Sequence, residues 1–454
     1  MPSMIQARMA SSAEMLAVFG DEALIAHALA FEAALAQAEA ECGVIPQGAA
    51  EAIAEAVRTA TFDAAALAEA AAQGGTLAIP LVKELGTQVA AIDRAAAGHV
   101  HFGGTSQDLA DTALVLQLRA ACALLRRDLR RLLQALARLA EAHRGTVMLA
   151  RTLMQPALPT TFGLKAASWL TGIEDAAARL EREAAQALML QFGGAAGTLS
   201  ALADKGVAVA LRLAALLGLP LPPMPWHTRR DGIAGLACAV GILTGALGKI
   251  ARDLSLLSQA ELGEAAEPSG PGRGGSSSLP HKRNPIAAMV ALAAANRAPG
   301  LVATLLSAMP QELERALGGW QSEAPTLASL YELAHGALLA MVEAIEGLKV
   351  DPLAMRRNLD RLNGLVLAER LMLALAPLMG RNEAHHAVVE LSRRAVAENR
   401  QLRDLALADA RVTAHLAPDA IAHLFDPSTY LGAAQDFIDA ALAAHRKAET
   451  NTRS

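Results

Sequence analysis

The residues best suited to chemistry lie in one stretch near the middle of the chain, "SGPGRGGSSSLPHKRNPI" (269–286). The cations Arg273, Lys282 and Arg283 and the imidazole of His281 lie among glycines and serines, and the stretch contains no acidic residue. Glycines let backbone N–H groups approach a ligand and let a loop open and close. We therefore expect a lid over an anion, most simply a carboxylate. The alternative is a disordered glycine and serine linker.

The sequence predicts a helix start directly after these cations. Asn284 is a favoured N-cap residue, and Pro285 is favoured at the first helical position. The free N–H groups and the positive end of the helix dipole would then lie beside Lys282 and favour an anion. A serine on such a lid could transfer a proton once water is excluded from the site.

The elements that must position this stretch are predicted to be long helices. Apolar residues make up 53% of the chain and aromatic residues only 3%, and alanine and leucine, both strong helix formers, dominate. Thr105 and Asp108 fit a capping box that opens a helix. Leucines then recur at spacings of three, four or seven residues, at Leu114, Leu118, Leu125, Leu129, Leu132, Leu136 and Leu139. The sequence therefore predicts an all-α protein.

The length of 454 residues exceeds one ordinary core and predicts two or three domains. Residues 1–101 form short segments broken by glycine and proline. Long helices are predicted within 102–350, at 160–191, 231–264 and 285–309, with the loop at 269–285. Segments shorten again over 351–454, which predicts a third, smaller helical domain.

Composition also limits the partners that we expect. A net charge of −5 favours neither nucleic acid nor a polyanion. Cys42, Cys122 and Cys238 are far apart and form no CxxC motif, which indicates reduced thiols in a cytoplasmic protein. No metal-ligand spacing of Cys or His stands out, and we expect neither a metal nor a cofactor. The uncharged run 232–248 is shorter than a membrane span of about twenty residues, so we interpret it as a buried helix, without a membrane.

Three blocks, in this order, resemble the fumarase/aspartase superfamily. "GGTSQDLADTAL" (103–114) resembles the family's Thr-Ser-x-Asp block, which binds substrate carboxylates. "RTLMQPALPTTFGLK" (151–165) is similar to the block Arg-Thr-His-x-Gln-Pro-Ala-x-Pro. "GSSSLPHKRNP" (275–285) is similar to the signature Gly-Ser-Ser-x-Met-Pro-x-Lys-x-Asn, with Leu279 in place of methionine. "EAALAQAEAECGVIP" and "LFDPSTYLGAA" further resemble the adenylosuccinate lyase branch, so the similarity spans nearly the whole chain.

The resemblance implies three helical domains, with boundaries at 1–101, 102–350 and 351–454 and a catalytic loop at 269–285. It also implies a central long-helix bundle that assembles into a homotetramer, in which each active site uses blocks from three subunits. The family's reaction is elimination or addition next to a carboxylate. A base removes the Cβ proton, an aci-carboxylate dianion forms, and the leaving group departs.

The resemblance assigns the catalytic roles to two loop residues. Ser276 aligns with the family's catalytic serine and is expected to move the carbon-bound proton, with Lys282 as the second candidate and as a stabiliser of the dianion. The residues expected to bind or orient substrate are His101, Thr105, Ser106, Arg151, Gln155, His281, Asn284 and Arg315. For Arg151 and Arg315 the alternative role is a structural salt bridge, and for His101 it is a structural hydrogen bond. His227 is a further histidine that could face the site.

Two departures from the family pattern narrow the expected reaction. The position of the family's histidine, which protonates the leaving group, is Leu153, and that of the glutamate paired with it is Met289. Loss of both together leaves no buried charge unpaired. A carboxylate leaves without protonation, whereas an amine does not. We therefore expect a cycloisomerisation, in which an internal carboxylate of a muconate tricarboxylate closes a lactone. The alternatives are an adenylosuccinate lyase-type elimination and an inactive structural protein on this fold.

Overall fold

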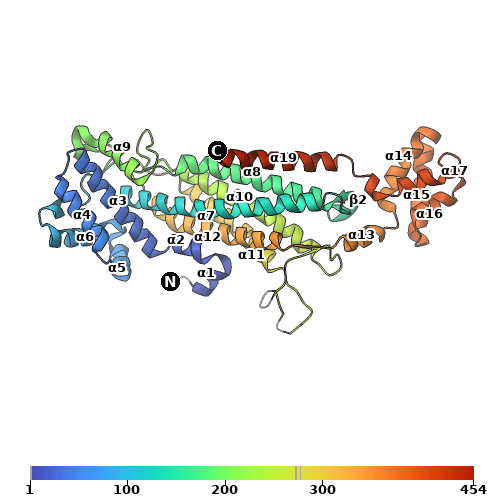
Figure 1. Cartoon of the computed structure of the whole chain (residues 1–454), viewed down its shortest axis with the longest axis horizontal. Helices are drawn as coiled ribbons and strands as arrows, with labels where there is room; N and C mark the ends of the chain where they lie inside the picture. The colour runs from blue at the N-terminus through green and yellow to red at the C-terminus, as the bar shows by residue number, and fades with distance from the viewer. Residues whose placement is uncertain (1–2, 271–273, 277, 454) are drawn as a thin grey trace. The chain divides into compact units, whose positions relative to one another are not determined.

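The computed structural model describes residues 3–270, 274–276 and 278–453, so Arg273 and Ser277 of the predicted loop lie outside the described residues. Within this part the chain is almost entirely helical, which confirms the all-α prediction (Figure 1). Five helices exceed twenty residues beyond the first hundred positions. They are α7 (Ser106–Ala142), α8 (Phe162–Ala187), α10 (Asp231–Leu257), α11 (Ile286–Ser307) and α12 (Gly319–Glu346).

The chain forms two compact units, and each of these five helices contributes residues to both. Unit 1 consists of residues 1–129, 176–248 and 290–339, and unit 2 of residues 130–175, 249–289 and 340–454. The division into three domains at 101 and 350 stays a prediction.

Unit 1 contains the N-terminal helices. In these, α3 packs against α4 and α9, and α4 packs against α6 and η1. The elements are α1 (Met4–Ala10), α2 (Ala13–Val18), α3 (Asp21–Glu41), α4 (Gln47–Thr59), α5 (Ala64–Gly74), α6 (Ala78–Ile92), η1 (Ala96–His99), η2 (Ser200–Lys205) and α9 (Gly206–Leu217). Helix α3 is central to the argument below because it carries two buried glutamates on its packed side, Glu32 and Glu39.

The leucine stripe predicted after Thr105 lies on α7. All seven of its leucines are at most 9% exposed. The 3.6-residue period places them on one side of the helix, and burial of each leucine removes apolar surface from water. The helix begins at Ser106, one residue after the predicted capping residue, and spans 37 residues.

Unit 2 contains one hairpin that the sequence did not predict. Strands β1 (Val147–Thr152) and β2 (Gln155–Thr161) pair antiparallel and include the first part of the second family block, 151–165. The block carries Pro156 and Pro159, which cannot donate to a sheet, but a two-stranded hairpin has only edge strands and tolerates them. Residues 265–266 (β3) and 349–350 (β4) form a second, shorter antiparallel pair.

The remaining elements of unit 2 follow residue 350, where the helices shorten as expected. Their buried core includes Leu371, Leu375, Leu391 and Leu405. The elements are α13 (Pro352–Asp360), η3 (Leu365–Leu367), α14 (Ala368–Met379), α15 (Arg381–Ala397), α16 (Leu402–Ala408), α17 (Ala410–Thr413), α18 (Pro418–Leu424), η4 (Pro427–Thr429) and α19 (Ala434–Arg453).

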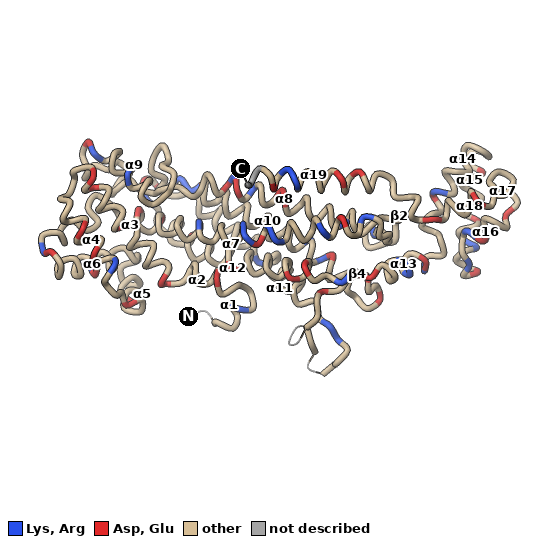
Figure 2. The backbone as a smooth tube through the Cα atoms, viewed as in Figure 1, with Lys and Arg blue, Asp and Glu red and all other residues tan. Residues whose placement is uncertain are grey.

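Charged residues are spread along the chain, whereas the most apolar segments are confined to a few helices. Acidic and basic residues alternate along the tube rather than forming long blocks of one sign (Figure 2). By length and composition alone, α10, α11 and α12 are apolar enough to cross a membrane, as is the bent pair 352–360 and 365–379. In the most apolar window of α10, 61% is buried inside the chain, but in that of α11 only 28% is buried. Much of the apolar surface of α11 is therefore not covered by the described residues of its own chain.

Candidate active site

The site residues predicted from the sequence divide between the two units. Unit 1 holds His101, Thr105, Ser106 and Arg315. Unit 2 holds the remaining six, which are Arg151, Gln155, Ser276, His281, Lys282 and Asn284. We therefore describe two groups of residues, one for each unit.

Asp108 organises the group in unit 1. Its carboxylate is fully buried and accepts hydrogen bonds from three backbone N–H groups, those of Thr105 at 3.2 Å, Gly193 at 3.0 Å and Gly194 at 2.8 Å. The side-chain amide of Gln191 donates to it at 3.1 Å. Asp108 thus fixes the loop at 192–194 against the start of α7. The predicted capping contact of Asp108 with the Thr105 N–H is present.

His227 is buried beside Asp108 and does not lie at an open surface. Its side chain is 5% exposed, and Nε2 lies 2.8 Å from Oδ1 of Asp108. The side-chain amide of Gln107 donates to the backbone oxygen of His227 at 2.8 Å. These buried hydrogen bonds hold the loop and the start of α7 in one arrangement. Within this unit His227 has the position of a structural residue.

Arg315 carries a charge that its own unit does not neutralise. Its guanidinium donates to the hydroxyl of Thr105 at 2.9 Å and to the backbone oxygens of Ala195 at 2.9 Å and Gly194 at 3.4 Å. All three acceptors are neutral, and among the described residues no carboxylate pairs with this arginine. A fixed guanidinium of this kind is suited to bind a carboxylate.

Arg151, the other predicted clamp, has a different environment. Its guanidinium donates to both carboxylate oxygens of Glu264, at 2.7 and 2.9 Å, and Glu264 is fully buried. Asn358 also donates to Glu264, at 2.8 Å. The structure therefore gives Arg151 a structural salt bridge, the alternative considered for it from the sequence. Its contact with substrate stays a prediction.

Leu153, which occupies the position of the family's histidine, lies at the tip of the hairpin. Thr152 pairs with Gln155, so Leu153 and Met154 form a two-residue turn. Both have positive φ, 49° and 65°, which a two-residue hairpin of this type requires and which side chains other than glycine rarely adopt. Leu153 is 97% exposed and Met154 66% exposed. Two strained apolar side chains at a tip are expected where another surface covers them.

Backbone contacts hold the two ends of the predicted catalytic loop together. Gly274 lies in the left-handed region at φ 66°, and its backbone oxygen accepts from the Asn284 N–H at 2.8 Å. A Cβ at residue 274 would lie 2.6 Å from the backbone oxygen of Asn284, so only glycine fits. The Ser276 hydroxyl accepts from the Leu279 N–H at 3.1 Å. The side chains of His281 and Lys282 are exposed, and no partner is found for either among the described residues.

The predicted helix start differs in its capping group. Helix α11 begins at Ile286, and the side-chain amide of Asn284 donates to the backbone oxygen of Gly275 at 3.4 Å instead of accepting from the helix. The carboxylate of Glu267 accepts from the N–H groups of Ala287 and Ala288, at 2.9 and 2.8 Å. The capping role predicted for Asn284 is therefore wrong. The anion at this helix start is the chain's own glutamate, which satisfies free N–H groups and complements the helix dipole.

Sequence reasoning missed several charged residues that are buried or partly buried. Glu264 and Glu267 follow α10 closely and hold two of the family blocks, yet the "GEAAEP" segment was read only as a helix end. Lys165, at the end of the second block, is half-buried, and burial lowers its pKa. Glu32 and Glu39 could have been noticed as acidic residues seven positions apart in an Ala- and Leu-rich helix, since this spacing places them on one side.

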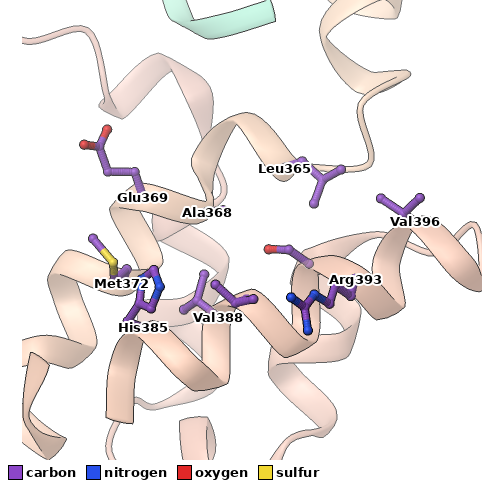
Figure 3. Close-up of a pocket in the computed structure, with 10 residues that line it drawn as sticks. Leu365, Ala368, Glu369, Met372, His385, Val388, Arg393 and Val396 are labelled. Atoms are coloured by element: carbon purple, nitrogen blue, oxygen red, sulfur yellow. The ribbon is translucent and has the colours of Figure 1, made fainter. Parts of the chain in front are cut away.

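In the part of the chain that the structure describes, neither a metal centre nor the cavity between α14 and α15 coincides with the predicted site residues. Among the described residues no group of His, Cys, Asp and Glu could hold a metal ion. A cavity of about 480 Å³ lies between α14 and α15, with Met372, His385 and Val388 along it (Figure 3). Its lining is mostly apolar and includes none of the residues predicted for the site.

Comparison with known proteins places the chain in a family. The sequence pattern described as Lyase matches residues 7–300, and that described as Adenylosuccinate lyase C-terminus matches residues 364–441. This chain belongs to the fumarase/aspartase lyase superfamily. The family membership inferred from the three sequence blocks is thereby confirmed.

Individual lyase relatives match along nearly the whole chain. A Bradyrhizobium diazoefficiens protein named 3-carboxy-cis,cis-muconate cycloisomerase is 53% identical over 437 residues, or 96% of this chain and 97% of that protein. A Pseudomonas aeruginosa protein of the same name is 51% identical over 434 residues, or 96% and 95%. The crystal structure of 3-carboxy-cis,cis-muconate lactonizing enzyme from Pseudomonas putida superposes with a TM-score of 0.94 at 43% identity, covering 98% of this chain and 99% of that one.

Proposed function

We propose that this chain is a cycloisomerase that interconverts 3-carboxy-cis,cis-muconate and 4-carboxymuconolactone. An internal carboxylate of the substrate adds across a double bond, the lactone ring closes, and one proton is delivered to carbon. The observation that carries this proposal is the similarity over nearly the full length to relatives of that name, at 53% and 51% identity. The reaction belongs to the isomerase class and fits the catabolism of aromatic compounds through the β-ketoadipate pathway.

The residues at two family positions support a carboxylate leaving group over an amine. Leu153 and Met289 occupy the positions of the family's acid pair, and neither can donate a proton. A nucleotide-releasing lyase needs such an acid, because an amine leaves poorly unless it is protonated. Opening of the lactone releases a carboxylate, which is stable without a proton. This difference disfavours the adenylosuccinate lyase-type reaction.

The proposed site combines positively charged side chains with a serine that can transfer a proton. Arg315 and the hydroxyl of Thr105 bind one substrate carboxylate, and Lys282 stabilises the dianion that forms next to another. Ser276 moves the carbon-bound proton. Ser106, Gln155, His281 and Asn284 orient the substrate. The exposure of Lys282 and His281 supports this assignment, because their side chains remain available to a ligand.

We propose further that the chain acts as a homotetramer whose sites use residues of several subunits. The apolar outer surface of α11 and the exposed hairpin tip at Leu153 and Met154 support this, because both present apolar side chains that a partner would cover. Of the three domains predicted at 1–101, 102–350 and 351–454, the central one would form the contacts between subunits.

The test is an ultraviolet assay of the purified protein with 3-carboxy-cis,cis-muconate. We expect loss of the conjugated diene absorbance with the wild type, and a large decrease in kcat with Ser276→Ala. Loss of absorbance that survives this substitution keeps the substrate and transfers the proton step to Lys282. If the wild type consumes no substrate, the cycloisomerase proposal is wrong. Adenylosuccinate is then the next compound to test, and inactivity toward both would favour a structural protein.

A further inference from the structure

A buried glutamate contacts one of the histidines that the sequence singled out. Oε1 of Glu32, on α3, lies 2.6 Å from Nδ1 of His101, which precedes the Thr-Ser block. The side chain of Glu32 is 1% exposed and that of His101 is 16% exposed. A carboxylate removed from water in this way is stabilised by a positively charged partner. The imidazole is the only group that the described residues provide for this oxygen.

The backbone around His101 is shaped to place its ring. His101 has φ 59°, in the left-handed region that residues other than glycine rarely adopt. At Gly104 an added Cβ would lie 3.3 Å from Cε1 and 3.4 Å from Nδ1 of the ring, so the absence of a side chain there makes room for the imidazole. Backbone strain that persists next to a binding block indicates a functional constraint.

The other ring nitrogen of His101, Nε2, becomes a donor when the ring is protonated. The hydrogen bond to Glu32 fixes Nδ1–H, and no partner is found for Nε2 among the described residues. Thr105 lies four residues further along the chain and accepts from Arg315 at 2.9 Å. The same short segment thus carries the imidazole and the hydroxyl that the guanidinium binds.

The charged groups around His101 agree with a protonated ring. Burial lowers the pKa of His101, but the hydrogen bond and charge of Glu32, together with the charge of Asp108, outweigh burial and raise it. Glu39 lies on the same helix and faces Glu32, and burial raises the pKa of Glu39 to about 9, so Glu39 is neutral at pH 7. Glu32 is the carboxylate that contacts the ring directly, at 2.6 Å.

We propose that Glu32 is a positioning residue that fixes His101 as a cationic donor to a carboxylate of the substrate. Together with Arg315, this donor would recognise a substrate that carries several carboxylates. The inference rests on the proposed function, because it requires a polycarboxylate substrate. No bond forms or breaks in this role, since the pair only binds and orients.

The test compares two equivalent substitutions on one helix, Glu32→Gln and Glu39→Gln, by measuring kcat and KM for 3-carboxy-cis,cis-muconate against pH. For Glu32→Gln we expect KM to rise about 10- to 100-fold, as for loss of a charge-assisted hydrogen bond, with a smaller change in kcat. We also expect the decrease in kcat/KM at alkaline pH to begin at lower pH, because His101 then loses its proton more easily. Glu39→Gln should leave KM and the pH profile unchanged.

Other outcomes separate this inference from the proposed function. Wild-type turnover with an unchanged KM and pH profile in Glu32→Gln would overturn the inference and leave the function intact. Absence of wild-type turnover would overturn both. Glu32→Asp keeps the charge and shortens the side chain, so it guards against a folding defect of Glu32→Gln. If Glu32→Gln does not fold, Glu32→Asp decides. A KM of Glu32→Asp above that of the wild type supports the inference, and a wild-type KM for folded Glu32→Asp overturns it.

Discussion

The buried carboxyl of Glu39 makes folding stability depend on pH in a predictable direction. Glu39 is fully buried on α3, and neither oxygen has a hydrogen-bond partner among the described residues. Burial, followed by the charge of Glu32, raises its pKa from the ordinary value of 4.5 to about 9. A desolvated carboxyl without donors is far more stable when neutral.

The sign follows from proton binding in the two states. Between pH 4.5 and about 9 the folded protein keeps the proton on Glu39, whereas the unfolded chain releases it. The native state therefore binds one more proton, and stability decreases by about 1.4 kcal/mol for each pH unit in this window. At pH 7 the loss relative to pH 4 amounts to roughly 3 kcal/mol.

Glu39→Gln should remove this dependence. Glutamine has nearly the shape of the neutral acid and does not ionise in the unfolded chain. We expect the variant to be more stable than the wild type by roughly 3 kcal/mol at pH 7, and by almost nothing near pH 4. As a matched control, Glu22→Gln at the exposed start of the same helix should change stability by less than about 0.5 kcal/mol at either pH.

The assay is urea unfolding followed by far-ultraviolet circular dichroism at pH 4.5, 6, 7 and 8. One protein concentration is kept throughout, because subunit association would otherwise contribute to stability. The stability difference between Glu39→Gln and the wild type should grow with pH. A difference that is equal at every pH, or a destabilised variant at pH 8, would refute the reasoning. Either result would show that Glu39 is ionised or hydrogen-bonded in the folded protein.

Three further substitutions test the site itself. Gly274→Ala should decrease kcat strongly without changing global stability, because a Cβ would lie 2.6 Å from the backbone oxygen of Asn284, where the two ends of the loop meet. Gly275→Ala is the matched control, because a Cβ there would have nothing within 4 Å. Equal activities of the two variants would contradict the close contact between Gly274 and Asn284. Arg315→Met should lower kcat/KM by about 10- to 100-fold, as for loss of one charge-assisted hydrogen bond, and steady-state kinetics measure it; an unchanged value would remove Arg315 from the site. Asp108→Asn should lower the free energy of unfolding in urea by about 3 kcal/mol, because an amide cannot accept from all the donors around this position. Asp204→Asn, at an exposed position, serves as the control. Equal urea midpoints for the two variants would show that the cluster around Asp108 adds no stability.

Several features of this protein followed from the sequence alone. Helix propensity and the leucine period of α7 are local properties, so the all-α fold and the buried stripe could be predicted. The three blocks resemble those of a superfamily in their residues and their order, which was enough to infer the family and the expected chemistry. The replacement of an acid pair by Leu153 and Met289 narrowed the reaction without any structure, because it concerns which side chains can donate a proton.

Only the tertiary structure decided which charges are available. Sequence could not distinguish Arg151 from Arg315, since each was a candidate either for binding substrate or for a structural salt bridge. The fold pairs Arg151 with the buried Glu264 and surrounds Arg315 with neutral acceptors, because partners more than a hundred residues apart meet only after folding. Glu267 at the start of α11 and Glu32 beside His101 also meet their partners only after folding, although these lie only 20 and 69 residues away in sequence. A side chain's charge can be read from the sequence, but whether that charge is neutralised depends on its neighbours in space.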